Sequence, residues 1–260
     1  MAKTNHSAVP SLLKDIRAAL EAKADERLRV AEAARTRSAL KTIGVRSTAV
    51  HAVARDTLGK GRAGLDYGTA ISLLDAAVAR RTREEILVAI EVLERFRRDF
   101  DESLFSHLDR WSSAAEDVEV AEALGVRVAA PALAKEPSRM ALVKKWARLK
   151  SLGKRRLAVL AASGLVTEGR REAGLVLELC EHLLNEDNPV LVSAVASLLR
   201  DTTKVDAKAV QDFLFRRSID GNPEILRAGS ENLDAARRAA LIAKLEAQAG
   251  VSAQFAAAEH

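Results

Sequence analysis

The chain has 260 residues, enough for one or two domains with a substantial buried core. It carries 41 basic and 36 acidic residues, a formal net charge of +5, so the location of the positive charge matters more than its total. Many alanines and leucines, few aromatic residues and no alternating β-branched run are typical of an all-helical protein. We expect no membrane span, because no stretch of about twenty apolar residues occurs. We expect no signal peptide, because the N-terminal MAKTNHSAV lacks an apolar core.

The thiol and imidazole groups give no indication of a metal or redox site. Cys180 is the single cysteine and lies in the apolar run LVLELCEHLL, so we expect a buried side chain and a reducing, cytoplasmic environment. The five histidines are scattered without metal-ligand spacing, and we therefore expect no bound metal.

Apolar residues at helical spacing predict a long succession of helices. Gly44 is expected to take a positive φ in the turn that precedes the third helix. Residues 129–136 are expected to be a connector, and residues 251–260 a frayed tail. The predicted helices span about Val9–Lys23, Asp25–Arg37, Ser47–Leu58, Thr69–Arg80, Thr82–Arg98, Phe100–Leu108, Ser113–Leu124, Ser138–Leu149, Gly153–Val166, Glu172–Leu184, Pro189–Arg200, Asp206–Phe215, Pro223–Ala228 and Asn232–Ala249.

The predicted helices form pairs that recur roughly every 35 to 45 residues, which indicates a solenoid. One pair cannot bury its own apolar face, so neighbouring pairs must stack. Small Ala and Ser residues among the aliphatic ones would let adjacent helices approach closely. No linker rich in Pro, Gly or Ser interrupts the pattern, and we expect a single domain over residues 1–250.

The stretch from Ser138 to Val166 predicts one helix pair with a basic bend. Pro137 and Ser138 resemble a helix start, and Trp146 falls on the apolar face, where we expect it in the core. Like charges repel, so the basic cluster suggests a negative partner such as a phosphate backbone. The alternative is a solvated helix end, because Lys and Arg also suit helix C-termini. The seven residues of this basic cluster are Lys144, Lys145, Arg148, Lys150, Lys154, Arg155 and Arg156.

Five segments, in their order and spacing, resemble the DNA alkylation repair proteins built from HEAT-like repeats, a type of alkylpurine DNA glycosylase. The resemblance extends from about Leu20 to Arg217. The segments are LKTIGVRSTAVHAVARD (40–56), EEILVAIEVLERFRRDFDESLF (84–105), residues 110–125, KKWARLKSLGKRRLAVLA (144–161) and NPVLVSAVASLLRDTTKVDAKAVQDFL (188–214).

The resemblance implies a HEAT-like, right-handed α–α superhelix whose basic concave face holds duplex DNA. It also implies hydrolysis of the N-glycosidic bond of cationic alkylated purines by a monomer associated with the nucleoid. In such a reaction a carboxylate stabilises positive charge on the sugar and helps to place a water. The cationic base is a good leaving group, so no metal or other cofactor is implied.

The family pattern places a catalytic aspartate four residues after a tryptophan and eight before a glycine. Counting back from Gly125 assigns the aspartate to Asp117, with Ser113 in place of the tryptophan. Counting forward from Trp111 reaches Ala115 instead, so Trp111 joins the cleft only if it precedes the helix that a capping box at Ser113 would open.

The resemblance also implies a set of DNA-binding residues. Its double-arginine motif falls on Arg155 and Arg156, of which Arg156 should grip the phosphate near the lesion. A second cleft tryptophan of the family is replaced here by Ser197. The further DNA-binding residues that we expect at the cleft are Lys154, Lys150, Arg148 and Trp111.

Gly59, Gly61 and Gly64 match the glycine spacing of a dinucleotide fingerprint, but that motif requires a preceding strand. A loop between repeats is the better interpretation, so no nucleotide cofactor is expected. Three functions stay open: a glycosylase using Asp117, a DNA-binding relative without chemistry, and a scaffold for protein partners. The family resemblance favours the first, whereas Ser197 and the displaced Trp111 favour the second.

Overall fold

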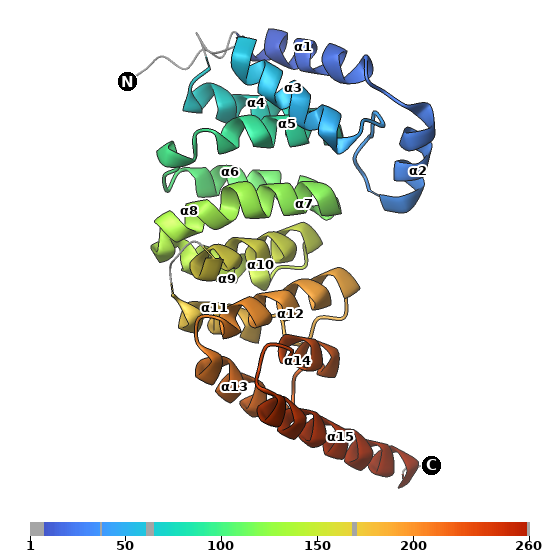
Figure 1. Cartoon of the computed structure of the whole chain (residues 1–260), viewed down its shortest axis with the longest axis vertical. Helices are drawn as coiled ribbons and strands as arrows, with labels where there is room; N and C mark the ends of the chain where they lie inside the picture. The colour runs from blue at the N-terminus through green and yellow to red at the C-terminus, as the bar shows by residue number, and fades with distance from the viewer. Residues whose placement is uncertain (1–7, 37, 61–64, 168–170, 259–260) are drawn as a thin grey trace.

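The computed structural model describes residues 8–36, 38–60, 65–167 and 171–258. Within these ranges every named element is helical, and the only strand-like contact is one bridge between Lys41 and Thr82. The helices lie in antiparallel pairs that stack one below another in a curved array (Figure 1). The structure therefore confirms the all-α, helical-repeat fold that the sequence predicts. None of the described helices is long and apolar enough to cross a membrane.

The upper half of the array begins with a helix that packs across the first pairs. Its helices are α1 (Val9–Glu21), α2 (Glu26–Thr36), α3 (Ser47–Lys60), α4 (Tyr67–Arg80), α5 (Arg83–Glu94), α6 (Leu104–Trp111), α7 (Val118–Leu124) and α8 (Ala130–Lys135). The lower half contains α9 (Met140–Ala147), α10 (Leu152–Thr167), α11 (Ala173–Glu181), α12 (Pro189–Thr203), α13 (Ala207–Arg216), α14 (Pro223–Gly229) and α15 (Ala235–Ala258).

Three local predictions differ from the structure. The capping box at Ser113 is wrong, because residues 114–116 form a 3-10 turn and Asp117 is the residue that caps α7. Ser138 does not cap α9, which follows a short 3-10 turn and has no side-chain cap. The expected connector at 129–136 is helical, because a π-helical turn at Gly125–Ala129 joins α7 directly to α8.

Two other backbone expectations concern Gly44 and the C-terminal tail. Gly44 has φ 83°, as the turn before α3 requires, and its amide donates to Glu84 at the start of α5. The stretch from residue 251, expected to be frayed, continues α15 as a helix through Ala258.

The apolar side chains form one continuous core from Val9 in α1 to Leu245 in α15. Small residues allow the close helix contacts that the sequence suggests. A Cβ on Gly164 of α10 would overlap the backbone of Ala130 in α8, so only glycine permits this approach. Cys180 is buried in the core, where desolvation raises the pKa of its thiol to about 12.

Tryptophan–aspartate pairs tie successive repeats together. The indole Nε1 of Trp111 donates to Asp75 Oδ1 at 2.7 Å, and that of Trp146 donates to Asp109 Oδ1 at 2.8 Å. The partners are 36 and 37 residues apart, so one device recurs at the repeat spacing. Both indoles are 1% exposed, and Trp146 is confirmed as a core residue.

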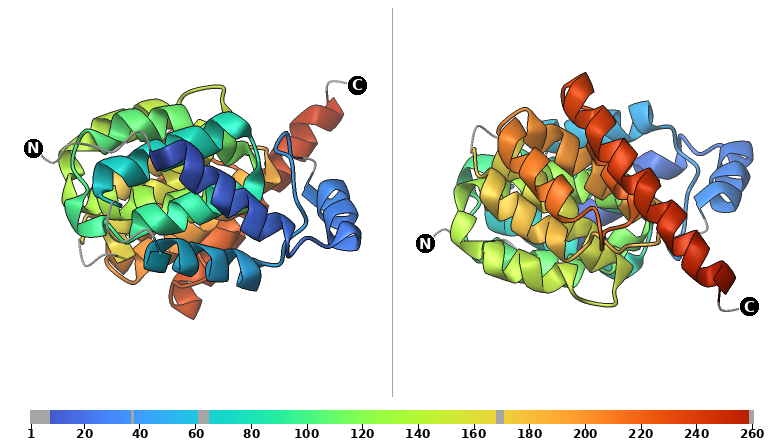
Figure 2. Two further views of the ribbon diagram at one scale, coloured as in Figure 1. Left: turned by 90° about the horizontal axis from the view of Figure 1, so that it is seen from above. Right: turned by 90° about the horizontal axis from the view of Figure 1, so that it is seen from below.

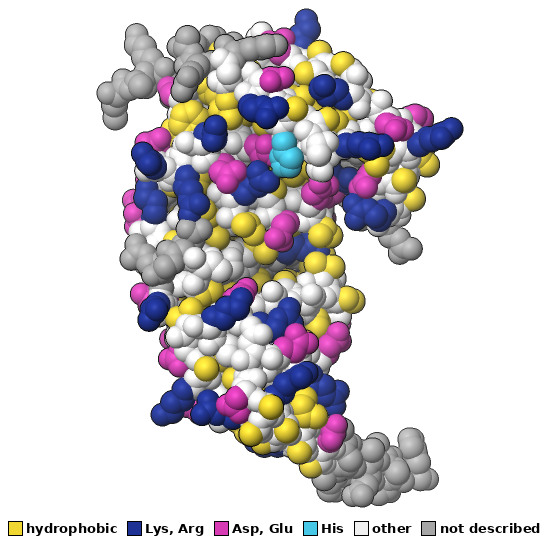
Figure 3. Space-filling view, viewed as in Figure 1, with side chains coloured by type: hydrophobic (Ala, Val, Ile, Leu, Met, Phe, Trp, Pro, Cys, Tyr) yellow, Lys and Arg dark blue, Asp and Glu magenta, His cyan; other side chains and the backbone are white. Residues whose placement is uncertain are grey.

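The turns that precede α5, α7, α10 and α12 lie on one side of the stack (Figure 1). We call this side the Asp117 edge; it comprises residues 81–82, 112–117, 148–151 and 182–188. Seen from above and below, α2 and α15 lie outside the stacked pairs (Figure 2). α2 projects on the same side as the Asp117 edge (Figure 1), and the surface below it is recessed (Figure 3).

Candidate functional site

Asp117 is buried and fully engaged by groups of the protein. It ends the 3-10 turn at residues 114–116, and its extended backbone, with φ −73° and ψ 132°, suits a helix N-cap. Its Oδ1 accepts hydrogen bonds from the amides of Glu119 and Val120, both at 3.1 Å. Its Oδ2 accepts from Arg83 Nε at 3.0 Å. The Asp117 side chain is 0% exposed, so its carboxylate acts here as a cap and as a counter-ion.

Arg83, which the sequence analysis did not single out, connects three helices at this position. It is the first residue of α5, is 3% exposed, and lies one repeat before Asp117 in the chain. Its Nη1 also donates to Glu32 Oε2 in α2 at 3.0 Å. The buried guanidinium thus compensates carboxylates from α2 and α7, and it fixes α2 against the Asp117 edge.

Arg156 reaches the same turn from α10. Its Nη1 donates to the carbonyl oxygens of Ala115 and Glu116, each at 3.0 Å, and the residue is 4% exposed. Burial lowers the pKa of Arg156, although the nearby Asp117 and Glu116 oppose this effect. The structure therefore brings Arg156 and Asp117 together at one turn, with the guanidinium directed at backbone carbonyls.

A glycine allows α10 to approach this turn. A Cβ on Gly153 would overlap the carbonyl oxygen of Ser112 and lie 3.3 Å from the backbone of Ala115. Side chains at the start of α10, including Arg156, can therefore reach the residues before Asp117. A glycine just after a helix start is the sequence signal that could have indicated this close contact.

No exposed aromatic ring stands where the family has its two cleft tryptophans. Trp111 precedes α7, as the sequence analysis required, but its ring is buried and its Nε1 donates to Asp75. Ser113 is exposed at the Asp117 edge, and Ser197 is half-buried within α12. Ser197 lies about two helical turns beyond the start of α12.

Neighbouring repeats supply acidic partners to much of the basic cluster. These partners are 31 to 45 residues away in the sequence, so the local sequence around the cluster does not reveal them. The pairs are Lys154 Nζ with Asp109 Oδ1 at 2.8 Å, Arg155 Nε with Glu186 Oε1 at 2.6 Å, and Lys144 with Glu178.

Three cations of the cluster stay exposed: Lys145, Arg148 and Lys150. Among the described residues none of the three makes an ion pair with a carboxylate. Arg148 Nη2 lies 2.8 Å from His182 Nε2 at the turn before α12. Burial and the charge of Arg148 lower the pKa of His182, which favours a neutral imidazole there. We call Lys145, Arg148 and Lys150 the exposed triad.

A groove of about 1040 Å³ adjoins Asp117, between α2, α3, α5 and α7. Val118 and Glu119, the residues just after Asp117, line it, whereas Asp117 itself lies beneath the surface. The charges in the groove are mixed. They are those of Glu32, Glu84, Glu91, Glu119, Glu122, Arg35, Arg46, Arg83 and Arg127.

The glycine motif and the question of a metal site can be followed only in the described residues. Gly59 lies within α3, while Gly61 and Gly64 fall outside the described residues. In the part of the chain that is described, no group of three or more His, Cys, Asp or Glu residues is placed to hold a metal ion.

Stacked helix pairs with polar contacts one repeat apart define a helical-repeat protein. A family model described as DNA alkylation repair enzyme matches residues 16–233, and the chain belongs to this family. A solved structure described as "Predicted DNA alkylation repair enzyme from Enterococcus faecalis" has a similar fold, with a TM-score of 0.66 and 13% sequence identity. The similarity covers 82% of this chain and 98% of that one. No curated protein sequence matches the chain.

Proposed function

We propose that this member of the DNA alkylation repair family binds duplex DNA along the Asp117 edge, through phosphate contacts, without releasing a base. The family match supports DNA as the ligand. The exposed triad supplies cations at this edge, with Arg148 and Lys150 in the turn before α10 and Lys145 in the last turn of α9. The absence of base release is supported by the hydrogen bonds of Asp117, because both of its carboxylate oxygens are bound within the protein.

Base release requires a carboxylate that can face the sugar and a water. To do so here, Asp117 would leave Arg83 and the start of α7. Removing one partner of a buried ion pair typically costs about 3 to 5 kcal/mol, because the other charge stays buried. The serines at positions 113 and 197 add no aromatic wall against a sugar or base. These features support a role for Asp117 in holding the edge together.

The second candidate is hydrolysis of the N-glycosidic bond of cationic alkylated purines, which family membership favours. In this mechanism Asp117 turns out of its cap, stabilises the developing positive charge on the sugar, and orients the attacking water. Arg156, which lies at the same turn, would exchange the carbonyls of Ala115 and Glu116 for the phosphate beside the lesion. The leaving group already carries a positive charge, so the step needs no metal.

Incubation with a methylated duplex separates the two candidates. We expect binding by the native protein and no abasic sites above the level of spontaneous depurination. The variants Asp117→Asn and Glu116→Gln should give the same background, with folding verified by circular dichroism. Glu116 is the matched control, because it is an exposed acid next to Asp117. Base release by the native protein and by Glu116→Gln, but not by folded Asp117→Asn, would establish the glycosylase instead.

A further inference from the structure

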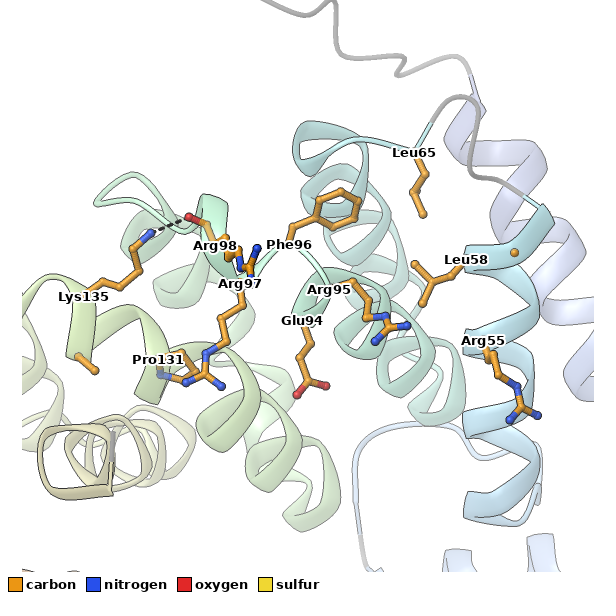
Figure 4. A pocket seen from close by; sticks show the side chains of 12 residues that line it. Arg55, Leu58, Leu65, Glu94, Arg95, Phe96, Arg97, Arg98, Pro131 and Lys135 are labelled. Carbon is orange, nitrogen blue, oxygen red and sulfur yellow. Dashed lines mark hydrogen bonds between the residues drawn. The ribbon is translucent and has the colours of Figure 1, made fainter. Parts of the chain in front are cut away.

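A second, larger concavity lies at the other ends of the helices. It encloses about 1450 Å³ between the C-terminal parts of α3, α5 and α8 (Figure 4). α5 starts at the Asp117 edge with Arg83 and has twelve residues, so its far end lies roughly 18 Å away along the axis. This basic pocket is therefore separate from the Asp117 edge. Lys and Arg side chains gather on this side of the surface (Figure 3).

Five cations and one acid line the basic pocket. The acid, Glu94, is already bound by Arg127 Nη1 at 3.2 Å. All four arginines of the pocket are exposed. Arg95 and Arg97 lie between the ends of α3 and α8 (Figure 4). The five cations are Arg55, Arg95, Arg97, Arg98 and Lys135.

Local structure compensates only part of this charge. Three helix C-termini converge here, and each contributes about half a negative charge at most. Lys135 is satisfied by the fold, because its Nζ donates to the carbonyl oxygens of Arg98 and Phe100 at 2.9 and 2.6 Å. For Arg55, Arg95 and Arg98 the described structure contains no carboxylate partner. The basic pocket thus holds an excess of positive charge that a polyanion would neutralise.

We propose that the basic pocket binds consecutive phosphates of a second DNA segment, distinct from the segment at the Asp117 edge. A single phosphate would occupy a small part of 1450 Å³, whereas the cations are distributed over three helices. Along one strand of a duplex, phosphates recur at about every 3.4 Å of helix axis, so several of them fit across such a surface. Guanidinium groups suit this ligand because their planar forks donate two parallel hydrogen bonds. The inference rests on the proposed function only in taking DNA as the polyanion.

The test uses the full chain carrying Arg55→Ala, Arg95→Ala and Arg98→Ala, with a fluorescein-labelled duplex as the probe. The anisotropy-derived affinity should fall, and the slope of log K against log salt should become shallower by about 2 to 3, since each lost phosphate contact contributes about 0.9. The control triple variant Lys14→Ala, Lys23→Ala and Lys208→Ala removes the same charge from exposed positions elsewhere. Its slope should remain that of the native protein.

Equal slopes for the pocket variant and the control variant would overturn the proposal, provided that both retain native circular dichroism and melting temperature. Inorganic tripolyphosphate provides a further arm. If the native protein binds it, the pocket variant does not, and DNA affinity is the same for both, then the pocket serves a free polyphosphate. That result would also overturn the proposal. Because the exposed triad is untouched in the pocket variant, failure here leaves the proposed function standing.

Discussion

When a buried carboxylate that pairs with a guanidinium is removed, the guanidinium is left as an unpaired buried charge, and this destabilises the fold. Asp117 is such a group, since Arg83 is 3% exposed and depends on it for one of its charge-assisted hydrogen bonds. The Asp117→Asn variant keeps an oxygen that can cap α7 but loses the negative charge. We expect it to lower the free energy of unfolding by about 3 kcal/mol, measured by urea denaturation.

A double-mutant cycle tests whether this loss arises from the pair. With Arg83→Met as the second change, the double variant should be less destabilised than the sum of the two single variants. Strict additivity, or an Asp117→Asn variant as stable as the native protein, would show that the pair does not hold the edge. Either result would contradict the proposal that Asp117 stabilises the fold through its ion pair with Arg83.

At the scale of helices, the start of α10 depends on a residue with no side chain. Gly153→Ala would place a methyl group on the carbonyl oxygen of Ser112, which is backbone and cannot turn away. The start of α10 must then move from the turn before Asp117, and Arg156 loses its carbonyl acceptors. We expect a loss of about 2 kcal/mol in stability, within the range for overpacking. Gly174→Ala is the matched control.

The control is suitable because a Cβ at Gly174 meets nothing within 4 Å, and the residue also lies near a helix start, in α11. Its alanine variant should melt at or slightly above the native temperature, since alanine is the better helix former. If both variants melt alike, the close approach of α10 to the 112–116 turn is not a constraint on this fold.

The helices were predictable because each carries an apolar stripe at helical spacing, as the bounds of α1, α3 and α12 illustrate. The helix α8 was missed because Pro131 and a short apolar run resemble a connector, whereas a π-helical turn carries the chain through it. The cap of α7 was misplaced because Ser113 and Asp117 both precede suitable residues. Only the packing of Arg83 and Arg156 distinguishes them.

The candidate site was predictable only in part, because its contacts depend on how the helix pairs stack. Asp117 and Arg156 were predicted to share one site, and the structure brings them to one turn. Arg83 as the partner of Asp117, and Asp109 as the partner of Lys154, were not predictable. These contacts join residues about one repeat apart, so they depend on how the pairs stack and not on local pattern.

At the scale of the whole molecule, the array presents two cationic surfaces at opposite ends of its inner helices. Two members of the exposed triad, Arg148 and Lys150, lie on the Asp117 edge, and Lys145 lies in the adjoining last turn of α9. The basic pocket lies at the far end of α5. A mild net charge of +5 therefore conceals a distribution with two separate cationic surfaces.

The salt dependence of duplex binding tests the central claim most directly. The variant Lys145→Ala, Arg148→Ala and Lys150→Ala should bind an unmodified duplex more weakly than the native protein, because each change removes one phosphate contact. Its plot of log K against log salt should be shallower by about 2 to 3, while the Lys14, Lys23 and Lys208 control variant keeps the native slope. A native slope in the triad variant, with the fold intact, would contradict DNA binding at the Asp117 edge.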